Sequence, residues 1–393
     1  MSCAWLAMED SRKISAFSAS MLIIKVNWGI GMIAMPFYLH SAGLFAGLLF
    51  FIISMLLAAD AAMLMHRLSE TIGDSTYVTL IQKAHGPKAG LLAAACVLLA
   101  FWGSAVAWLK FIGDNLARFL PLPLTGTWYI AILCIPLMSC AWLNEIKILE
   151  RFSFLGLLAG QLFVILMLIL SASHWAMWPS YFAQQPFLRI GSFPVAMGIA
   201  AFCNEGMVVM ASEVSASMHV PYKFKSSMVW AVTYFSANYL LMSLCGDFLY
   251  SFLAHDVVAQ EVTLSKAFTV TIAHRVAVLL YVFQLLLTFP SSLFLMFQNF
   301  QPLFPTYPRL PRLAIILSFC CVAMVLPRFG DFLALFGAIA NSLCIYILPH
   351  MAFLAHAKDQ DLGLRRVACW TVMLIFGLCG GLLSCVISLE QLA

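Results

Sequence analysis

A carboxylate with an adjacent glycine, and a separate glycine pair, are the groups in this sequence whose types and positions could do chemistry. Glu205 lies inside an apolar run and is followed by Gly206, while Gly29 and Gly31 interrupt an earlier apolar run. Lys25 lies one helical turn before Gly29. Glycines in a lipid-embedded helix free backbone groups, which survive only where they face a cavity or a neighbouring helix. A carboxylate at that depth is costly, so it is a candidate for binding an ion or a ligand.

The chemistry of such a site favours a zwitterion. A helix that restarts at about Gly31 points unpaired N–H groups and its positive dipole end at the cavity, which suits a carboxylate. The freed carbonyl groups and Glu205 suit an ammonium group, so the pattern indicates an amino acid. A close packing groove between helices is the alternative explanation for Gly29 and Gly31. The residues that we expect to bind substrate are Asn27, Gly29, Ile30, Gly31, Met32, Trp102, Phe202, Asn204 and Glu205.

Ion coupling is expected at Glu205, Lys25, Ser291 and Ser292. Glu205 could take a proton, accept the substrate amine, or do both in turn. Lys25 either extends to the membrane surface or places a fixed positive charge in the ion path. Ser291 and Ser292 follow Pro290, so their hydroxyl groups either ligate Na⁺ or bond to the backbone that the proline frees. Ion coupling therefore has a proton and a sodium interpretation.

Three further acids have simpler expected roles. Glu213 lies two helical turns beyond Glu205 and is expected either to latch a gate by pairing with Lys or Arg, or to be structural. Asp114 follows Lys110 by four residues, so we expect an ion pair within one helix. Asp247 ends an apolar run and is expected at the membrane interface.

The sequence shows no sign of catalytic or resident-metal chemistry. It contains no phosphate-binding loop, no nucleophile elbow and no His/Cys cluster with metal-ligand spacing. Trp102, Trp108 and Phe202 are candidates for cavity walls, although aromatic residues in membrane helices more often pack. We therefore expect neither an enzyme nor a bound cofactor or metal.

Composition identifies the elements that must position these groups. The chain has 393 residues, of which 63% are hydrophobic and 10% charged, against about 25% charged residues in soluble domains. This balance excludes a soluble enzyme and a disordered chain, and the unbroken apolar runs exclude an outer-membrane barrel. The net charge of +4 is too small to indicate a nucleic-acid partner. An all-α polytopic membrane protein remains.

Eleven apolar segments are long enough to be candidate membrane spans, each of which needs about 20 residues. Basic residues between them favour one side by about three to one, which places the N-terminus in the cytosol. Residues 69–88 are expected to form either a short amphipathic helix or a plain loop. The expected spans are 17–38, 42–66, 89–117, 128–144, 152–172, 192–216, 226–250, 273–298, 311–327, 331–354 and 367–388.

The spans divide into two groups of five. Because five is odd, a second repeat is inverted relative to the first, and its interrupted helix meets that of the first repeat at the midplane. We expect a cytosolic tail at 1–16, the first repeat at 17–172, an outer loop at 173–190 and the second repeat at 191–355. Residues 356–393 would supply a cytosolic loop, an eleventh helix and a short outer C-terminus.

Two segments carry a resemblance to a known family. LIIKVNWGIGMIAMPFYLHSAG at 22–43 and FCNEGMVVMASEVSASMHVP at 202–221 resemble segments of the amino acid/auxin permease family, most closely its proton-coupled amino acid transporter branch. Further likenesses begin at Cys140, Leu286 and Leu335 and follow the family order over nearly the whole chain. The resemblance implies an eleven-span fold of the LeuT type with broken helices 1 and 6, and alternating access.

The resemblance also bears on the site. It implies that Gly29, Ile30, Gly31, Phe202 and Glu205 contribute to substrate binding. Asn204 replaces an aromatic residue of the family, which affects the expected range of substrates. Lys25 stands near the position where sodium-coupled relatives place a polar cation ligand, which argues against Na⁺.

The expected function is secondary active transport of small neutral amino acids driven by H⁺, with Na⁺ coupling as an alternative. A sensor that keeps the same pocket is another hypothesis. The expected partners are an amino acid substrate and the lipid bilayer, without nucleic acid, and the chain is expected to be a monomer. We expect it in the plasma membrane or in an endolysosomal or vacuolar membrane, with its N-terminus in the cytosol.

Overall fold

The computed structural model describes residues 13–74, 76–120, 122–142, 146–253, 272–300, 309–325, 334–356 and 363–392. Within these ranges the chain is helical, apart from connections and one backbone bridge between Ile14 and Met218. Residues 1–12 of the expected tail, residues 254–271 and residues 357–362 lie outside the described part.

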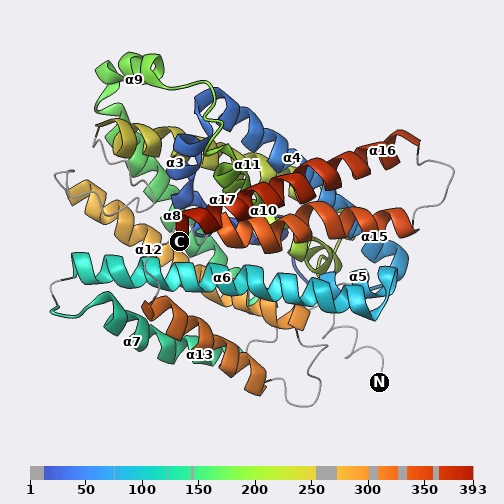
Figure 1. The fold of residues 1–393 in the computed structure, drawn as a ribbon. Helices are drawn as coiled ribbons and strands as arrows, with labels where there is room; N and C mark the ends of the chain where they lie inside the picture. Colours follow the sequence, from blue (N-terminus) through green and yellow to red (C-terminus); the bar gives the residue numbers. More distant parts are fainter. Residues whose placement is uncertain are drawn as a thin grey trace.

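The described helices follow one another along the chain as Figure 1 shows. The first half contains α2 (Ala16–Asn27), α3 (Gly31–Ala42), α4 (Leu44–Ile72), α5 (Tyr77–His85), α6 (Pro87–Phe119), α7 (Gly126–Met138), α8 (Ile146–Ala172) and α9 (Trp178–Gln184). The second half contains α10 (Phe193–Ala216), α11 (Phe224–Gly246), η4 (Asp247–Leu253), α12 (Ile272–Phe300), α13 (Arg309–Val325), η6 (Gly337–Asn341), η7 (Leu343–Ile347), α15 (Leu348–His356), α16 (Gly363–Val372), η9 (Met373–Cys379) and α17 (Gly380–Leu392).

Length and composition make this a multi-pass membrane protein. In the described part of the chain, eight helices are long and apolar enough to cross a bilayer, and α2 with α3 makes a ninth if the bent pair is one span. The helix at Gly126–Trp142 and the 17-residue α13 are shorter. Each predicted segment thus overlaps a helix, while the count that meets the length criterion is eight or nine.

Helix α10 lies at the centre of the bundle, with α2, α3, α4, α17 and η6 packed around it (Figure 1). In its most apolar stretch 83% of the residues are buried, compared with 33% for the C-terminal helix Gly363–Ile387. A helix that is buried on all sides can present polar side chains to several neighbours without exposing them to lipid.

The predicted interruption of the sixth segment is wrong. Helix α10 is continuous from Phe193 to Ala216, and Pro194 lies in its first turn, where the missing N–H leaves no hydrogen bond unmade. Gly206 has a packing role instead. A Cβ at this position would lie 2.7 Å from Cγ1 of Val26, so the glycine lets α2 approach α10 closely. The first segment, by contrast, is broken as predicted between α2 and α3.

Two sequence-based expectations about local structure can be compared with the structure. Residues 77–85 form the short helix α5, which buries Tyr77, Val78, Leu80 and Ile81. In α6, Lys110 Nζ lies 3.2 Å from Asp114 Oδ2, so the expected ion pair within one helix is confirmed.

Asp247, expected at the membrane interface, is buried between helices, with 1% of its surface exposed. Its Oδ2 accepts a hydrogen bond of 2.8 Å from the Tyr181 hydroxyl, and its Oδ1 lies 3.4 Å from His40 Nδ1. Burial raises the pKa of Tyr181, so the hydroxyl remains a proton donor. This cluster links α9 in the connection before α10 to α3 and to the end of α11.

Candidate functional site

The first span bends by 56° between α2 and α3. Helix α2 ends at Asn27, and Trp28 caps it with an N–H that donates to the carbonyl groups of Ile24 and Lys25. Helix α3 begins at Gly31. The bend removes three successive carbonyl groups from the regular helical pattern, although Gly29 O still accepts the N–H of Met32 over 3.2 Å. It also frees N–H groups at the start of α3, beside the central helix α10.

The three freed carbonyl groups are bound by side chains from α11 and α12. The Tyr239 hydroxyl donates to Asn27 O, Gln284 Nε2 donates to Trp28 O over 2.6 Å, and the Tyr281 hydroxyl donates to Gly29 O over 2.6 Å. Unpaired carbonyl groups are costly in a lipid environment, so these donors stabilise the bend. The carbonyl groups expected to receive an ammonium group therefore already have protein donors.

Unlike the carbonyl groups of the bend, three of its N–H groups lack a hydrogen-bond partner in the described part of the chain. Within the described residues, the N–H groups of Gly29, Ile30 and Gly31 have no hydrogen-bond acceptor. Space beside them is tight: a Cβ on Gly31 would lie 2.8 Å from Cys203 Sγ and 3.1 Å from the Tyr239 hydroxyl. Gly31 thus allows close helix packing and also leaves its N–H accessible from the cavity, so the two interpretations of the glycines are compatible.

Glu205 faces this bend from α10, with 6% of its surface exposed. Its Oε1 accepts a hydrogen bond of 3.1 Å from Ser104 Oγ, which also donates to Ala100 O. Its Oε2 is buried and makes no hydrogen bond of acceptable geometry among the described residues, although the Asn341 side chain of η6 lies near the carboxylate. One carboxylate oxygen is thus held in place, while the other is available to a proton or to a cationic group.

A cavity lies between the bend and Glu205 and encloses about 20 Å³. That volume holds about one water molecule, so an amino acid would require the surrounding helices to move apart. Seven of the predicted site residues line this cavity, namely Asn27, Gly29, Ile30, Gly31, Phe202, Glu205 and Ser292.

Comparison with known proteins identifies the family. The family described as transmembrane amino acid transporter protein matches residues 12–393. The chain belongs to this family. Amino acid transporter AVT1E of Arabidopsis thaliana is 22% identical over 402 residues, covering 95% of this chain and 74% of the relative. Solute carrier family 38 member 8 of Mus musculus is 23% identical over 389 residues, covering 91% of this chain and 88% of the relative.

A solved structure supports the fold of this amino acid transporter family member. The substrate-bound, outward-open structure of a Na⁺-coupled sialic acid symporter matches with a TM-score of 0.65 at 11% sequence identity. The match covers 96% of this chain and 89% of the symporter chain. At this identity the likeness shows the fold alone, which is a LeuT-like transporter fold.

Three predicted substrate residues of this transporter lie outside the cavity lining. Asn204 Nδ2 donates to Ser54 Oγ and to Ala200 O, each over 3.0 Å. Trp102 Nε1 donates to Ser318 Oγ over 2.8 Å, towards α13. Met32 is buried within α3 but does not line the cavity. Each points away because one or two residues along a helix rotate a side chain by about 100–200°.

Lys25 does not extend to the membrane surface. It is fully buried, its Cε lies close to Gly156 of α8, and its Nζ has no partner among the described residues. The alternative of a fixed charge beside the bend therefore remains as a proposal.

The remaining predicted site residues are the two serines on α12 and the second glutamate on α10. Ser292 lines the cavity, while Ser291 is buried next to it in sequence, and neither hydroxyl has a hydrogen bond within the described residues. The proposed bond to the backbone freed by Pro290 is therefore not observed. Glu213 lies about 12 Å along α10 from Glu205, and it pairs with no Lys or Arg in the described ranges.

Sequence reasoning missed the polar residues that hold the site. Glu205 is contacted by Ser104. The bend is contacted by Tyr239 on α11 and by Tyr281 and Gln284 on α12. In the sequence each of these residues is a polar side chain inside an apolar run, but its partner cannot be identified from the sequence alone. Trp108, named as a wall candidate, does line the cavity.

Within the described residues, no group of three or more His, Cys, Asp or Glu side chains is arranged to hold a metal ion. The donor set at the cavity consists of backbone N–H groups, one carboxylate and hydroxyl groups. This set suits a small zwitterion.

Proposed function

We propose that this protein is a secondary active transporter that moves small neutral amino acids by alternating access, coupled to protons. The observation that carries the proposal is the pairing of three backbone N–H groups without acceptors with the free Oε2 of Glu205 across one cavity. The N–H groups bind the substrate carboxylate, and Glu205 binds the substrate amine or a proton.

The recognition step uses the bend differently from the sequence-based expectation. Because protein side chains occupy the carbonyl groups of Asn27, Trp28 and Gly29, the substrate ammonium group is directed to Glu205. Phe202 and Trp108 form apolar walls, which favours a small uncharged side chain. Ser104 holds Glu205 in the orientation that leaves Oε2 towards the cavity.

The coupling step requires Glu205 to change partner. When the substrate amine leaves, a proton neutralises the buried carboxylate, because a bare charge at this depth is costly. Lys25, Ser291 and Ser292 lie near the ion path in this proposal, and Glu213 acts at the gate. The cavity expands when α2 and α3 move about their bend.

The same proposal includes the membrane arrangement. It has eleven spans in two inverted repeats, 17–172 and 191–355, with the tail at 1–16 in the cytosol. The connection at 173–190 is the outer loop, and 356–393 supplies the last helix. The transporter works as a monomer in the plasma membrane or in an endolysosomal or vacuolar membrane.

Uptake of labelled amino acids into proteoliposomes tests the proposal. A pH gradient without Na⁺ should drive accumulation of small neutral amino acids, and Glu205→Gln should abolish its dependence on pH. Accumulation that follows only a Na⁺ gradient would replace the proton with Na⁺. Binding of an amino acid without counterflow would leave the sensor as the function, and an unchanged pH profile in Glu205→Gln would exclude Glu205 as the coupling group.

A further inference from the structure

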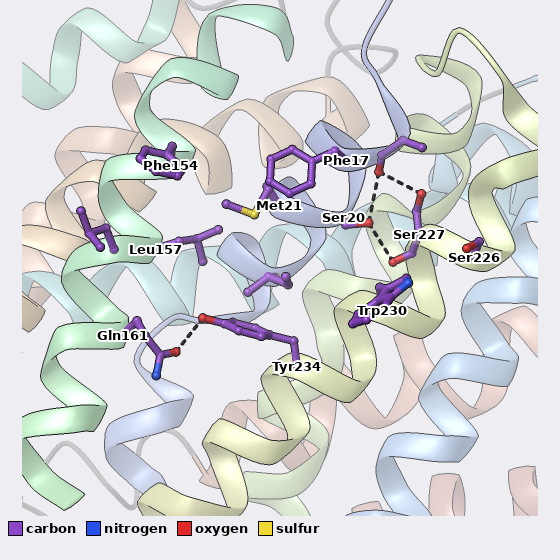
Figure 2. Close-up of a pocket in the computed structure, with 13 residues that line it drawn as sticks. Phe17, Ser20, Met21, Phe154, Leu157, Gln161, Ser226, Ser227, Trp230 and Tyr234 are labelled. Carbon is purple, nitrogen blue, oxygen red and sulfur yellow. Dashed lines mark hydrogen bonds between the residues drawn. The ribbon is translucent and has the colours of Figure 1, made fainter. Parts of the chain in front are cut away.

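A second cavity lies between the half-helix α2 and helices α8 and α11 (Figure 2), and it shares no lining residue with the cavity at Glu205. It measures about 480 Å³, within the range of about 300–1,000 Å³ that is typical of sites for small molecules. Its walls are mainly apolar, with Phe17 and Met21 on α2 facing Phe154 and Leu157 on α8.

The cavity is continuous with the surface that faces lipid. Phe17 and Trp230 at its rim are 69% and 71% exposed, and Phe154 and Leu158 are also exposed. In a helical membrane protein, apolar side chains with this exposure face acyl chains. A hydrocarbon chain can therefore enter the cavity sideways from the bilayer.

One end of the cavity lies next to the bend. The Tyr234 hydroxyl donates a hydrogen bond of 2.6 Å to Gln161 Oε1, which joins α11 to α8 at this end (Figure 2). The ring of Tyr234 also packs edge-on against Trp28, with the centroids 5.9 Å apart. A chain that fills the cavity thus ends against the residues that support the bend.

The other end is electropositive. Helices α2, α8 and α11 all begin at this end, so their positive dipole ends lie there. Lys13 and Lys223 lie four residues before the cavity-lining Phe17 and Ser227. Backbone hydrogen bonds from Ile14 N to Ser217 O and from His219 N to Ile14 O hold the two lysine-bearing segments together.

We propose that this cavity is a binding site for an anionic phospholipid, with an acyl chain between α2, α8 and α11 and the phosphate beside Lys13 and Lys223. The charge at the open end complements an anionic headgroup, and the apolar depth complements its chain. Bound lipid holds α2 against α8 and α11. The site is separate from the substrate cavity and does not depend on the transported substrate.

Native mass spectrometry of the full chain tests the proposal. The protein is purified with equal amounts of phosphatidylserine and phosphatidylcholine that carry identical acyl chains, and the retained lipids are counted. We expect preferential retention of phosphatidylserine by roughly 30-fold, the effect of two lysines close to an anionic headgroup. Equal retention of both lipids, or of neither, would overturn the anionic site.

Two matched pairs of variants locate the binding. Leu158→Trp fills the cavity mouth and should remove the retained lipid, while Leu155→Trp on the same helix, equally exposed but outside the cavity, should keep it. Lys13→Gln with Lys223→Gln should reduce the preference roughly 30-fold, whereas Arg67→Gln with Lys88→Gln should preserve it. Equal loss in both members of either pair would contradict the proposal, and the elution volume of each variant confirms that it is folded.

Discussion

Gln284 on α12 donates a hydrogen bond of 2.6 Å to the carbonyl oxygen of Trp28, although 256 residues separate them. Trp28 lies in the bend, so this contact fixes the first span to α12 beside the cavity at Glu205. The Gln284 side chain is fully buried. Because lipid offers no replacement donor, this hydrogen bond stabilises the bend.

Gln284→Leu should therefore destabilise the protein. The change leaves the Trp28 carbonyl without a donor, which costs about 1–3 kcal/mol for a buried group. Thermal unfolding of the purified protein in detergent should show a lower melting temperature. Thr371→Val is the control, because the Thr371 hydroxyl is exposed and bonds only within its own helix. Equal melting temperatures for the two variants would show that the bend does not need Gln284.

Gly31→Val should weaken substrate binding by at least about tenfold, or 1.4 kcal/mol. The added Cβ would lie 2.8 Å from Cys203 Sγ, so the valine closes the space between α3 and α10. Gly191→Val is the matched control, since a Cβ there has no heavy atom within 4 Å. Equilibrium binding of labelled substrate measures the effect.

A double-mutant cycle separates contact at Gly31 from general damage. Gly31→Ala should weaken binding less than Gly31→Val, and adding Cys203→Ala should restore part of the affinity by removing the nearest atom. Purely additive losses would show that Cys203 does not set the space beside Gly31.

Ser104→Ala should lower substrate affinity by tenfold or more. The hydroxyl donates to Glu205 Oε1, and a hydrogen bond to a charged group contributes about 1.5–3 kcal/mol. The control is Ser243→Ala, which removes another buried hydroxyl that bonds only to Leu240 O. If both variants bind substrate equally well, the orientation of Glu205 does not depend on Ser104.

Tyr181→Phe should destabilise the contact between α9 and the end of α11. Burial raises the pKa of Tyr181, so its hydroxyl is protonated and donates to Asp247 at every pH below its ordinary value of about 10. The stability that this bond contributes is therefore fully present at neutral pH and is lost only in strongly alkaline solution. The difference in melting temperature between the variant and the parent should be constant from about pH 6 to about pH 9.

A difference that instead disappears between those pH values would show that another group controls the contact. His40, which also faces Asp247, is the group to replace next, by His40→Gln.

The sequence was sufficient to predict the break and the acid beside it, because both depend on local features. Gly29 and Gly31 within an apolar run predict a loss of helix, and Glu205 at membrane depth predicts a function. The sequence could not predict the donors to the bend. Tyr281 and Gln284 lie more than 250 positions away from the groups that they contact, and only the packing of α12 against the bend brings them there.

Helix phase and context account for the remaining differences. Asn204 and Glu205 are adjacent in sequence, yet their side chains point to different neighbours because each helical residue rotates by about 100°. Gly206 looked like a second break, but a glycine can serve close packing as well as unwinding. Only the approach of Val26 in the structure distinguishes these roles.

The side chain of Asn27 connects two helices through opposite ends of one amide. Its Nδ2 donates to Ile23 O in α2, and its Oδ1 accepts the N–H of Met207 in α10 over 2.9 Å. Any tilt that separates these helices must leave the buried amide oxygen of Asn27 without its donor. Unless a water molecule or the substrate replaces that donor, the loss costs about 1–3 kcal/mol, so solvent entry and tilting are expected to occur together.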